Sequence, residues 1–300
     1  MQGEPATPDA ASGCAVERMA FAQARRVGRI IISVAVCVAV SMWGFIIWST
    51  ELESEVARRN GLTQGYNLAA GMAAELSDAF DDIAVELDRL DSALSTGALT
   101  ADRVRAALAT PGLVRSDTAI RVIGPDGRLV FSTLPSDPES GDDSRQPHFI
   151  FHRDNPAAGL LVDPPGAANP GDDPRIEVSQ RLTAADGRFA GEVQVLPKAA
   201  SLLRLVRQID LGRRGNILVV GIDGIVRAGY DRAHPDGSNG VGVDLRGAPY
   251  PDTLGPGGTA DYTRIGRVMG GERLMTLRRL HDYPLAVLVA QDLDVVMASP

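Results

Sequence analysis

Apolar and polar positions follow three different patterns along this chain, and each pattern predicts a different kind of element. Residues 30–48 (IIISVAVCVAVSMWGFIIW) contain no charge and have about the length of a helix that crosses a bilayer. Residues 51–95 favour a helix, with a heptad seam at 4-3-4-3-4 spacing formed by Leu76, Phe80, Ile83, Leu87, Leu90 and Leu94. Beyond residue 115, short apolar stretches alternate with Gly, Pro and Asp turns, which predicts strands.

The charges that flank residues 30–48 predict an orientation. Four arginines precede the run and three glutamates follow it, and Trp43 and Trp48 lie at its second end. The positive-inside rule and the preference of Trp for the interface place the N-terminus in the cytoplasm and residues after about 50 outside. No small-residue cleavage site follows, so we expect an uncleaved anchor rather than a signal peptide.

The helix at 51–95 continues directly from this segment and therefore predicts a stalk. Its apolar seam has two possible partners. It could pair with a second copy of the chain, giving a homodimer, or it could pack on the sheets of its own chain. Thr100 is a good N-cap for a second short helix over residues 101–109.

One hairpin pattern occurs twice. IRVIGPDGRLV at residues 120–130 returns 97 positions later as ILVVGIDGIVR. Each copy begins a series of predicted hairpins and long polar loops, and a short helix is predicted between the copies at 201–209. Further strands are expected at 149–151, 176–182, 188–196, 262–268, 273–280 and 285–291. The fold class is α+β, with two similar modules that each form an antiparallel sheet, and the helices cover them.

Composition narrows the class of partner. The net charge is −8, which argues against a nucleic-acid surface, since phosphate binding requires clustered Lys and Arg. The two cysteines are Cys14 and Cys37, so the chain beyond residue 48 has neither a disulfide nor a thiol nucleophile. We expect no nucleic-acid partner.

Four segments resemble one family. HFIFHRDNPAAGLLV (148–162), VSQRLTAADGRFAGEVQV (178–195), IDLGRRGNILVVGIDGIVRA (209–228) and RLHDYPLAVLVAQD (279–292) are similar to segments of the periplasmic double-Cache sensor. This family has two tandem PAS-like modules on a long N-terminal helix, and the likeness is closest to versions fused to bacterial diguanylate cyclases and histidine kinases. It implies signal transduction at the bacterial inner (cytoplasmic) membrane, with the modules in the periplasm.

The patterns and the resemblance together predict the domains. We expect a cytoplasmic tail at 1–28, a transmembrane helix at 29–49, and the stalk and capping helices at 50–112. The outer PAS-like module is predicted at 113–199, a connecting helix at 200–211, and the membrane-proximal module at 212–293. Residues 294–300 would form a C-terminal end, truncated before a second span that the family normally has.

The candidate ligand site combines the segment around residue 150 with one strand. Arg offers a planar set of donors for a carboxylate, and His offers a donor or acceptor near neutral pH. The resemblance places this segment at a ligand pocket, which implies a small amino acid or organic acid ligand held by His148, Phe149, His152, Arg153, Asp154, Ser179 and Arg181. The alternative is structural, with Arg153 and Asp154 paired in a loop and His152 satisfied in the core.

Other chemistry is weakly supported. His148 and His152 would lie about 13 Å apart on the strand predicted for residues 149–151, and no third metal ligand is evident, so no metal site is expected. GGERL at 270–274 differs from the diguanylate cyclase signature and is interpreted as a turn. No nucleophile triad or glycine-rich cofactor motif is present, so we expect no cofactor and no catalytic residue.

The predicted function is the extracytoplasmic small-ligand sensing module of a membrane receptor of the diguanylate cyclase or histidine kinase type. A ligand in the outer module would change how the stalk packs. The alternatives are a stand-alone single-pass protein that binds a ligand or partner without its own output, and an exported enzyme.

Overall fold

The computed structural model describes residues 10–109, 117–135, 137, 141–164, 173–204, 211, 214–247 and 254–298, with side chains from residue 33 onward except that of residue 50. The chain forms two compact units, Met1–Val56 and Ala57–Pro300. Helix α1 (Ala10–Leu94) contributes to both.

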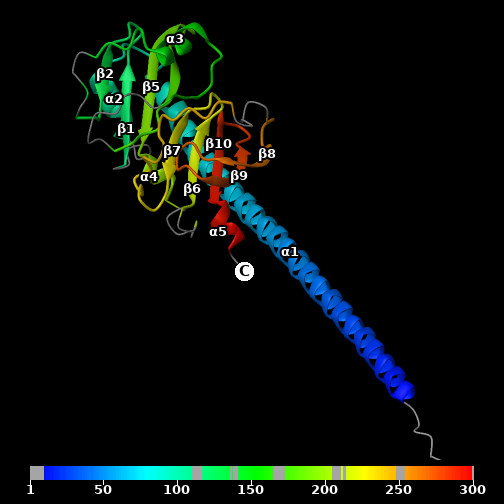
Figure 1. Cartoon of the computed structure of the whole chain (residues 1–300). Helices are drawn as coiled ribbons and strands as arrows, with labels where there is room; N and C mark the ends of the chain where they lie inside the picture. Colours follow the sequence, from blue (N-terminus) through cyan, green and yellow to red (C-terminus); the bar gives the residue numbers. More distant parts are fainter. Residues whose placement is uncertain are drawn as a thin grey trace, which may run out of the picture. The chain divides into compact units, whose positions relative to one another are not determined.

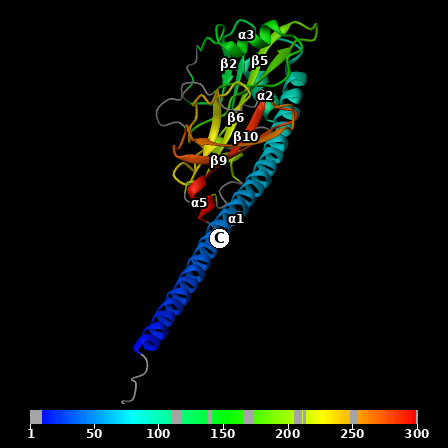
Figure 2. The ribbon, with the colours of Figure 1, turned by 45° about the vertical axis from the view of Figure 1, so that its right-hand side comes forward.

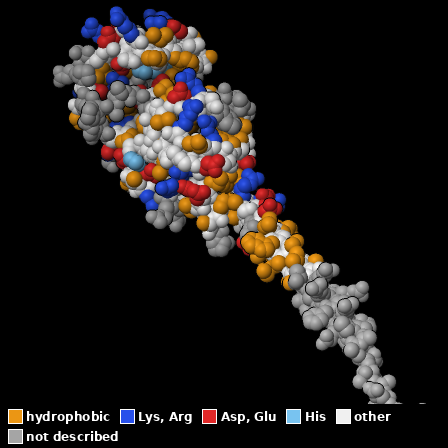
Figure 3. Space-filling view, in the orientation of Figure 1, with side chains coloured by type: hydrophobic (Ala, Val, Ile, Leu, Met, Phe, Trp, Pro, Cys, Tyr) orange, Lys and Arg blue, Asp and Glu red, His pale blue; other side chains and the backbone are white. Residues whose placement is uncertain are grey.

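The first unit contains the apolar run. The large side chains from Val34 to Trp48 are exposed in the structure, and Figure 3 shows hydrophobic side chains gathered on the visible face of this part of the helix. In the described part of the chain, α1 is the one helix that is long and apolar enough to cross a membrane, with a mean hydropathy of 1.7 over its best window. This agrees with the span predicted from the sequence.

The second unit contains two antiparallel sheets of five strands each. Their strand orders are β2-β1-β5-β4-β3 and β7-β6-β10-β9-β8. The first sheet comprises β1 (Thr118–Ile123), β2 (Leu129–Ser132), β3 (Leu161–Val162), β4 (Val178–Thr183) and β5 (Phe189–Pro197). The second comprises β6 (Asn216–Gly221), β7 (Val226–Tyr230), β8 (Thr259–Ile265), β9 (Glu272–Arg279) and β10 (Leu285–Asp292).

The repeated hairpin is a repeat in space. In the first copy, the side chain of Asp126 accepts a hydrogen bond from the backbone of Arg128, and Gly127 has a φ of 83°. In the second, Asp223 accepts from Ile225, and Gly224 has a φ of 95°. In both copies the pairing register shifts at the equivalent position, which leaves one extra residue on the strand after the turn. The Asp-Gly pair is used because an Asp side chain caps such a turn and Gly adopts a positive φ without strain.

Helix α1 packs against both sheets through its heptad seam. All six seam residues from Leu76 to Leu94 are buried, in one core with the inner faces of both sheets. The helix contacts the second sheet first, where Tyr66 donates to Asp261, and the first sheet near its end, where Gln180 donates to Asp88. Figures 1 and 2 show α1 passing alongside both sheets of this unit. The sequence left two partners open for the seam, a second copy of the chain or the chain's own sheets. In the structure the seam packs on the chain's own sheets.

One segment was predicted wrongly. Residues 149–151 were expected to form a strand, but α3 (Pro147–Asp154) is a helix. Pro147 occupies its first turn, where the fixed φ of proline suits a helix and its missing N–H costs nothing. His148, Phe149 and His152 are buried on one face, so the spacing of four that separates the two histidines is helical spacing.

Smaller differences concern the ends of elements. Helix α2 (Ala101–Leu108) begins after Thr100 as predicted. The helix predicted at 201–209 is α4 (Ala199–Leu202) in the described residues, and residues 205–210 lie outside them. The short strand β3 and helix α5 (Leu293–Met297) were not predicted. Gly270 and Gly271 form a turn with positive φ, as the interpretation of GGERL required.

Candidate functional site

The first sheet has one apolar face and one polar face. Alternate residues of its central strands point to opposite faces. Ile120, Val178 and Val193 belong to the core shared with α1. The neighbouring positions carry buried polar side chains instead, and α3 lies against this polar face. Arg121, Ser179, Arg181, Glu192 and Gln194 come from the strands, and His148 and His152 come from α3.

The first half of this cluster is centred on a fully buried carboxylate. His148 Nδ1 lies 2.7 Å from Glu192 Oε1, and the amide of Gln194 donates to the same oxygen at 3.0 Å. Gln194 Oε1 in turn accepts from Arg121 at 2.7 Å. Arg121 is neutralised by Asp137 at 2.8 Å and Asp143 at 3.0 Å, so its charge is not available to Glu192.

The second half of the cluster is a chain of hydrogen bonds. The Ser179 hydroxyl donates to Asp163 at 3.0 Å, and His152 Nε2 lies 3.0 Å from the same hydroxyl oxygen. Because the serine has one proton and gives it to Asp163, His152 must donate from Nε2. Its Nδ1 is then an acceptor, and that atom is buried with no hydrogen-bond partner in the described residues.

Arg181 closes one end of the cluster. Its Nη1 donates to the backbone oxygens of His152 and Arg153 at 2.6 and 3.3 Å, at the end of α3. Its guanidinium lies 4.8 Å from the centre of the Phe189 ring, and Phe149 packs edge-on against the same ring at 5.3 Å. Arg181 therefore holds the helix to the sheet.

The other two predicted residues lie outside the cluster. Arg153 and Asp154 form an exposed ion pair at 2.7 Å, which corresponds to the structural alternative for them. The structure thus brings together five of the seven predicted residues, namely His148, Phe149, His152, Ser179 and Arg181.

Four residues that line the cluster were missed by sequence reasoning: Arg121, Asp163, Glu192 and Gln194. A signal for three of them exists in the strands. Glu192 and Gln194 alternate with Val193 and Val195, and Arg121 lies between Ile120 and Val122. Polar residues in such positions would normally face solvent, and only the presence of α3 over this face turns them inward.

Burial is the largest influence on the pKa values of four titratable groups in and beside the cluster. Burial raises the pKa of Asp163 and of Glu177. Burial lowers the pKa of His152 to about 4. Burial also opposes protonation of His148, but the hydrogen bond and negative charge of Glu192 outweigh it and raise the pKa of His148. A buried site with more carboxylates than cations destabilises its own carboxylates.

Three atoms of the cluster are buried without a partner in the described residues. Two of them, Glu192 Oε2 and His152 Nδ1, are potential hydrogen-bond acceptors, and the third, Arg181 Nε, is a potential donor. Arg181 and Glu192 occupy directly opposite positions on β4 and β5, which places them about 5 Å apart at Cβ. Unsatisfied buried groups of this kind are costly, and a bound ligand is one way to satisfy them.

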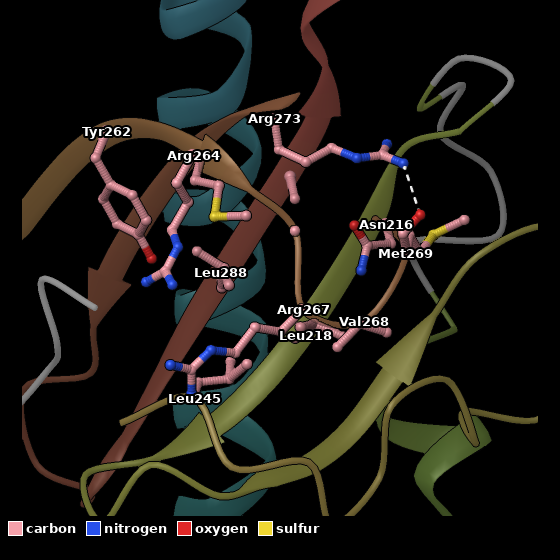
Figure 4. Close-up of a pocket in the computed structure, with 13 residues that line it drawn as sticks. Asn216, Leu218, Leu245, Tyr262, Arg264, Arg267, Val268, Met269, Arg273 and Leu288 are labelled. Carbon is pink, nitrogen blue, oxygen red and sulfur yellow. Dashed lines mark hydrogen bonds between the residues drawn. The ribbon is translucent and has the colours of Figure 1, made fainter. Parts of the chain in front are cut away.

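The equivalent face of the second sheet contains a small cavity of about 30 Å³. Figure 4 shows it between β6, β8, β9, β10 and the connection from β8 to β9. Its floor is apolar, and arginines lie around it.

Known structures show what this architecture is. The extracellular domain of rpHK1S-Z16, which is named as a histidine kinase, is 25% identical over 82% of this chain and 100% of that one, with a TM-score of 0.64. The ligand-binding domain of the Pseudomonas aeruginosa PAO1 chemoreceptor PctB, solved with L-Arg, is 16% identical over 81% and 99% of the two chains, with a TM-score of 0.59. The ligand-binding domain of PctC from the same bacterium, solved with GABA, is 16% identical over 77% of this chain and 100% of that one, with a TM-score of 0.55.

The chain has the fold of a double-Cache sensor. This confirms the α+β class and the resemblance noted in the sequence. The solved relatives are extracellular ligand-binding domains of histidine kinases and chemoreceptors, and the chain is a sensing module of this kind. No protein-family model matches the sequence, and no curated protein matches it.

Proposed function

We propose that the polar cluster on the first sheet binds a free amino acid and that the chain is the extracytoplasmic input part of a membrane receptor. The observation that supports this most directly is the pair of unpartnered acceptors, Glu192 Oε2 and His152 Nδ1. An ammonium group supplies donors for such acceptors and the positive charge that the cluster lacks.

The arginine side of the cluster suits the other end of the same ligand. Arg181 Nε is a buried donor without a partner in the described residues, and a carboxylate is the natural acceptor for it. An organic acid without an amine would bring further negative charge beside Glu192 and Asp163. The proposal therefore favours an amino acid over an organic acid.

Binding can be tested on the full chain in lipid nanodiscs with a panel of the common amino acids and succinate. At least one amino acid should raise the melting temperature, since a ligand that binds only the folded state stabilises it. Glu192→Gln should abolish that shift, while the exposed-turn control Asp186→Asn should preserve it. Stabilisation by succinate alone, or an unchanged response in Glu192→Gln, would contradict the assignment.

The membrane topology is a second part of the proposal. The arginine-rich flank, the interfacial Trp43 and Trp48 and the glutamates that follow support an anchor with the N-terminus in the cytoplasm. In intact spheroplasts, a membrane-impermeant maleimide should label an engineered Ser92→Cys but leave Cys14 unlabelled until the cells are lysed. Labelling of Cys14 in intact spheroplasts would reverse the orientation.

The output and the oligomeric state follow from the same role. We infer a receptor of the histidine kinase or diguanylate cyclase type that acts as a homodimer. Because the seam from Leu76 to Leu94 is buried in the chain's own core, a dimer has to use a surface other than this seam, and we propose the exposed faces of α1. Sedimentation of the detergent-solubilised full chain should show a dimer. Val85→Glu tests one exposed face of α1: loss of the dimer in this variant would place that face in the interface, and a dimer that persists would place it outside.

A further inference from the structure

The two modules have the same fold but opposite chemistry at equivalent positions. The sequence repeat aligns Arg121 with Leu218. Strand pairing extends the match, since Arg121 pairs with Gln194 and Leu218 pairs with Leu288. The face that is polar in the first sheet is therefore apolar in the second. A ligand suited to one site is unsuited to the other.

The cavity on the second sheet has a mainly apolar lining and opens to solvent. Leu218, Met275 and Leu288 line it from the sheet and form its floor, and Val268 and Met269 line it from the connection between β8 and β9. All three floor residues belong to a hydrophobic core separate from the one shared with α1. The volume of about 30 Å³ is that of one or two water molecules, so it has room for a tail of one or two carbons.

The rim of this cavity is cationic, and one cation there is free. Arg273 is fully engaged, because it donates to the backbone oxygens of Gly270 and Met269 and lies 3.8 Å from Asp292. Figure 4 shows its hydrogen bond to Met269 as a dashed line. Arg267 donates to the backbone of Asp244. Arg264 forms no hydrogen bond or ion pair within the described ranges of the chain, although it lines the cavity.

Tyr262 adds a neutral donor beside this cation. Residues 262 and 264 lie on the same face of β8, as the alternating burial of the strand shows, and Figure 4 shows both side chains extending from that strand. Tyr262 and Arg264 both line the cavity. An arginine fork with a phenol beside it is a good receptor for a carboxylate.

We propose that the second module binds a small monocarboxylate with a tail of one or two carbons. The carboxylate would lie against Arg264, with Tyr262 and Arg267 at the rim, and the tail would enter the apolar cavity above Leu218 and Leu288. This site is independent of the amino acid site proposed on the first sheet.

Calorimetric titration of the full chain in nanodiscs tests the proposal with four probes. Propionate should bind saturably. Propylamine has the same number of carbons as propionate and the opposite charge and should not bind, hexanoate should bind much more weakly because the cavity excludes its tail, and chloride should not compete. Arg264→Gln should weaken propionate binding by about tenfold or more, the usual effect of losing a charged hydrogen bond, and the exposed-turn control Arg188→Gln should not.

The two sites are distinguished by crossing the variants. Glu192→Gln should leave propionate binding intact, and Arg264→Gln should leave the response to amino acids intact. Propionate binding that is lost in Glu192→Gln and kept in Arg264→Gln would overturn the proposal. Absence of propionate binding, equal binding of propylamine, or equal binding of hexanoate would each overturn it as well, whatever the outcome at the first sheet.

Discussion

Glu192 and Arg181 face each other directly across the ladder between β5 and β4. Glu192 carries a buried acceptor and Arg181 a buried donor, each without a partner in the described residues. Opposite charges at such positions normally pair with each other. Here one oxygen of Glu192 contacts His148, and Nη1 of Arg181 donates to the end of α3. Each group therefore keeps one atom, Glu192 Oε2 and Arg181 Nε, available for a hydrogen bond to a ligand.

Arg181 should be needed for stability as well as for binding. Arg181→Met removes the donor to the carbonyl oxygens of His152 and Arg153 and the contact with Phe189, so the free energy of unfolding should fall by about 2–3 kcal/mol. Arg181→Lys restores the charge but not the planar fork, and it should recover less than half of the loss. Urea denaturation of both variants measures this, and full recovery in Arg181→Lys would show that the fork geometry is unimportant.

His152 should make the protein less stable in acid. Its pKa is lowered to about 4 in the folded chain, against an unfolded value of about 6.5. The folded state therefore binds fewer protons, and stability falls as the pH drops from about 6.5 toward 4, by about 3 kcal/mol in total.

His152→Gln isolates this contribution, because Gln keeps a donor for Ser179 but does not titrate. The raised pKa values of Asp163 and Glu177 act in the opposite direction, since protonation of these carboxyls favours the folded state. Comparing unfolding free energies at pH 7 and pH 4.5, the loss in acid should be smaller in the variant than in the native chain. An equal loss of unfolding free energy in the variant and the native chain would show that a group other than His152 binds the proton that destabilises the fold in acid.

Two neighbouring positions on α1 should respond very differently to truncation. Leu87 is fully buried, whereas Val85 is 68% exposed. Leu87→Ala should cost about 2–5 kcal/mol of unfolding free energy through the cavity it leaves, and Val85→Ala should change it by less than about 0.5 kcal/mol. If the destabilisation by Leu87→Ala depended on protein concentration, the seam would lie between copies instead of within one.

Gly191 should not tolerate a side chain. Its φ is +122°, and an added Cβ would lie 2.0 Å from the backbone oxygen of Ile123. Gly191→Ala therefore forces the β1–β5 pair apart and should destabilise the chain by more than about 2 kcal/mol. Gly159 has open space around it and an ordinary φ, so Gly159→Ala is the matched control and should be neutral in thermal denaturation.

The sequence predicted the elements whose signals are local. The Asp-Gly turns at 126 and 223 carry their conformation in two residues, and the seam from Leu76 to Leu94 needs only its spacing. The site was predicted less completely because it depends on contacts between distant segments. HFIFH has the apolar content of a strand, and only Pro147 and the spacing of the two histidines indicate a helix. Once that helix covers the sheet, Arg121 and Glu192 change from surface residues to buried ones.

The single core that α1 shares with both sheets has a consequence for how inputs combine. Ile120 of one module and Ile217 of the other pack in that core with the same helix, so a displacement of α1 alters both sheets at once. Any coupling that this core transmits between the two proposed sites would change both affinities by the same factor, as thermodynamic reciprocity demands. The shared helix would then carry the effect of either ligand along the same path toward the first unit.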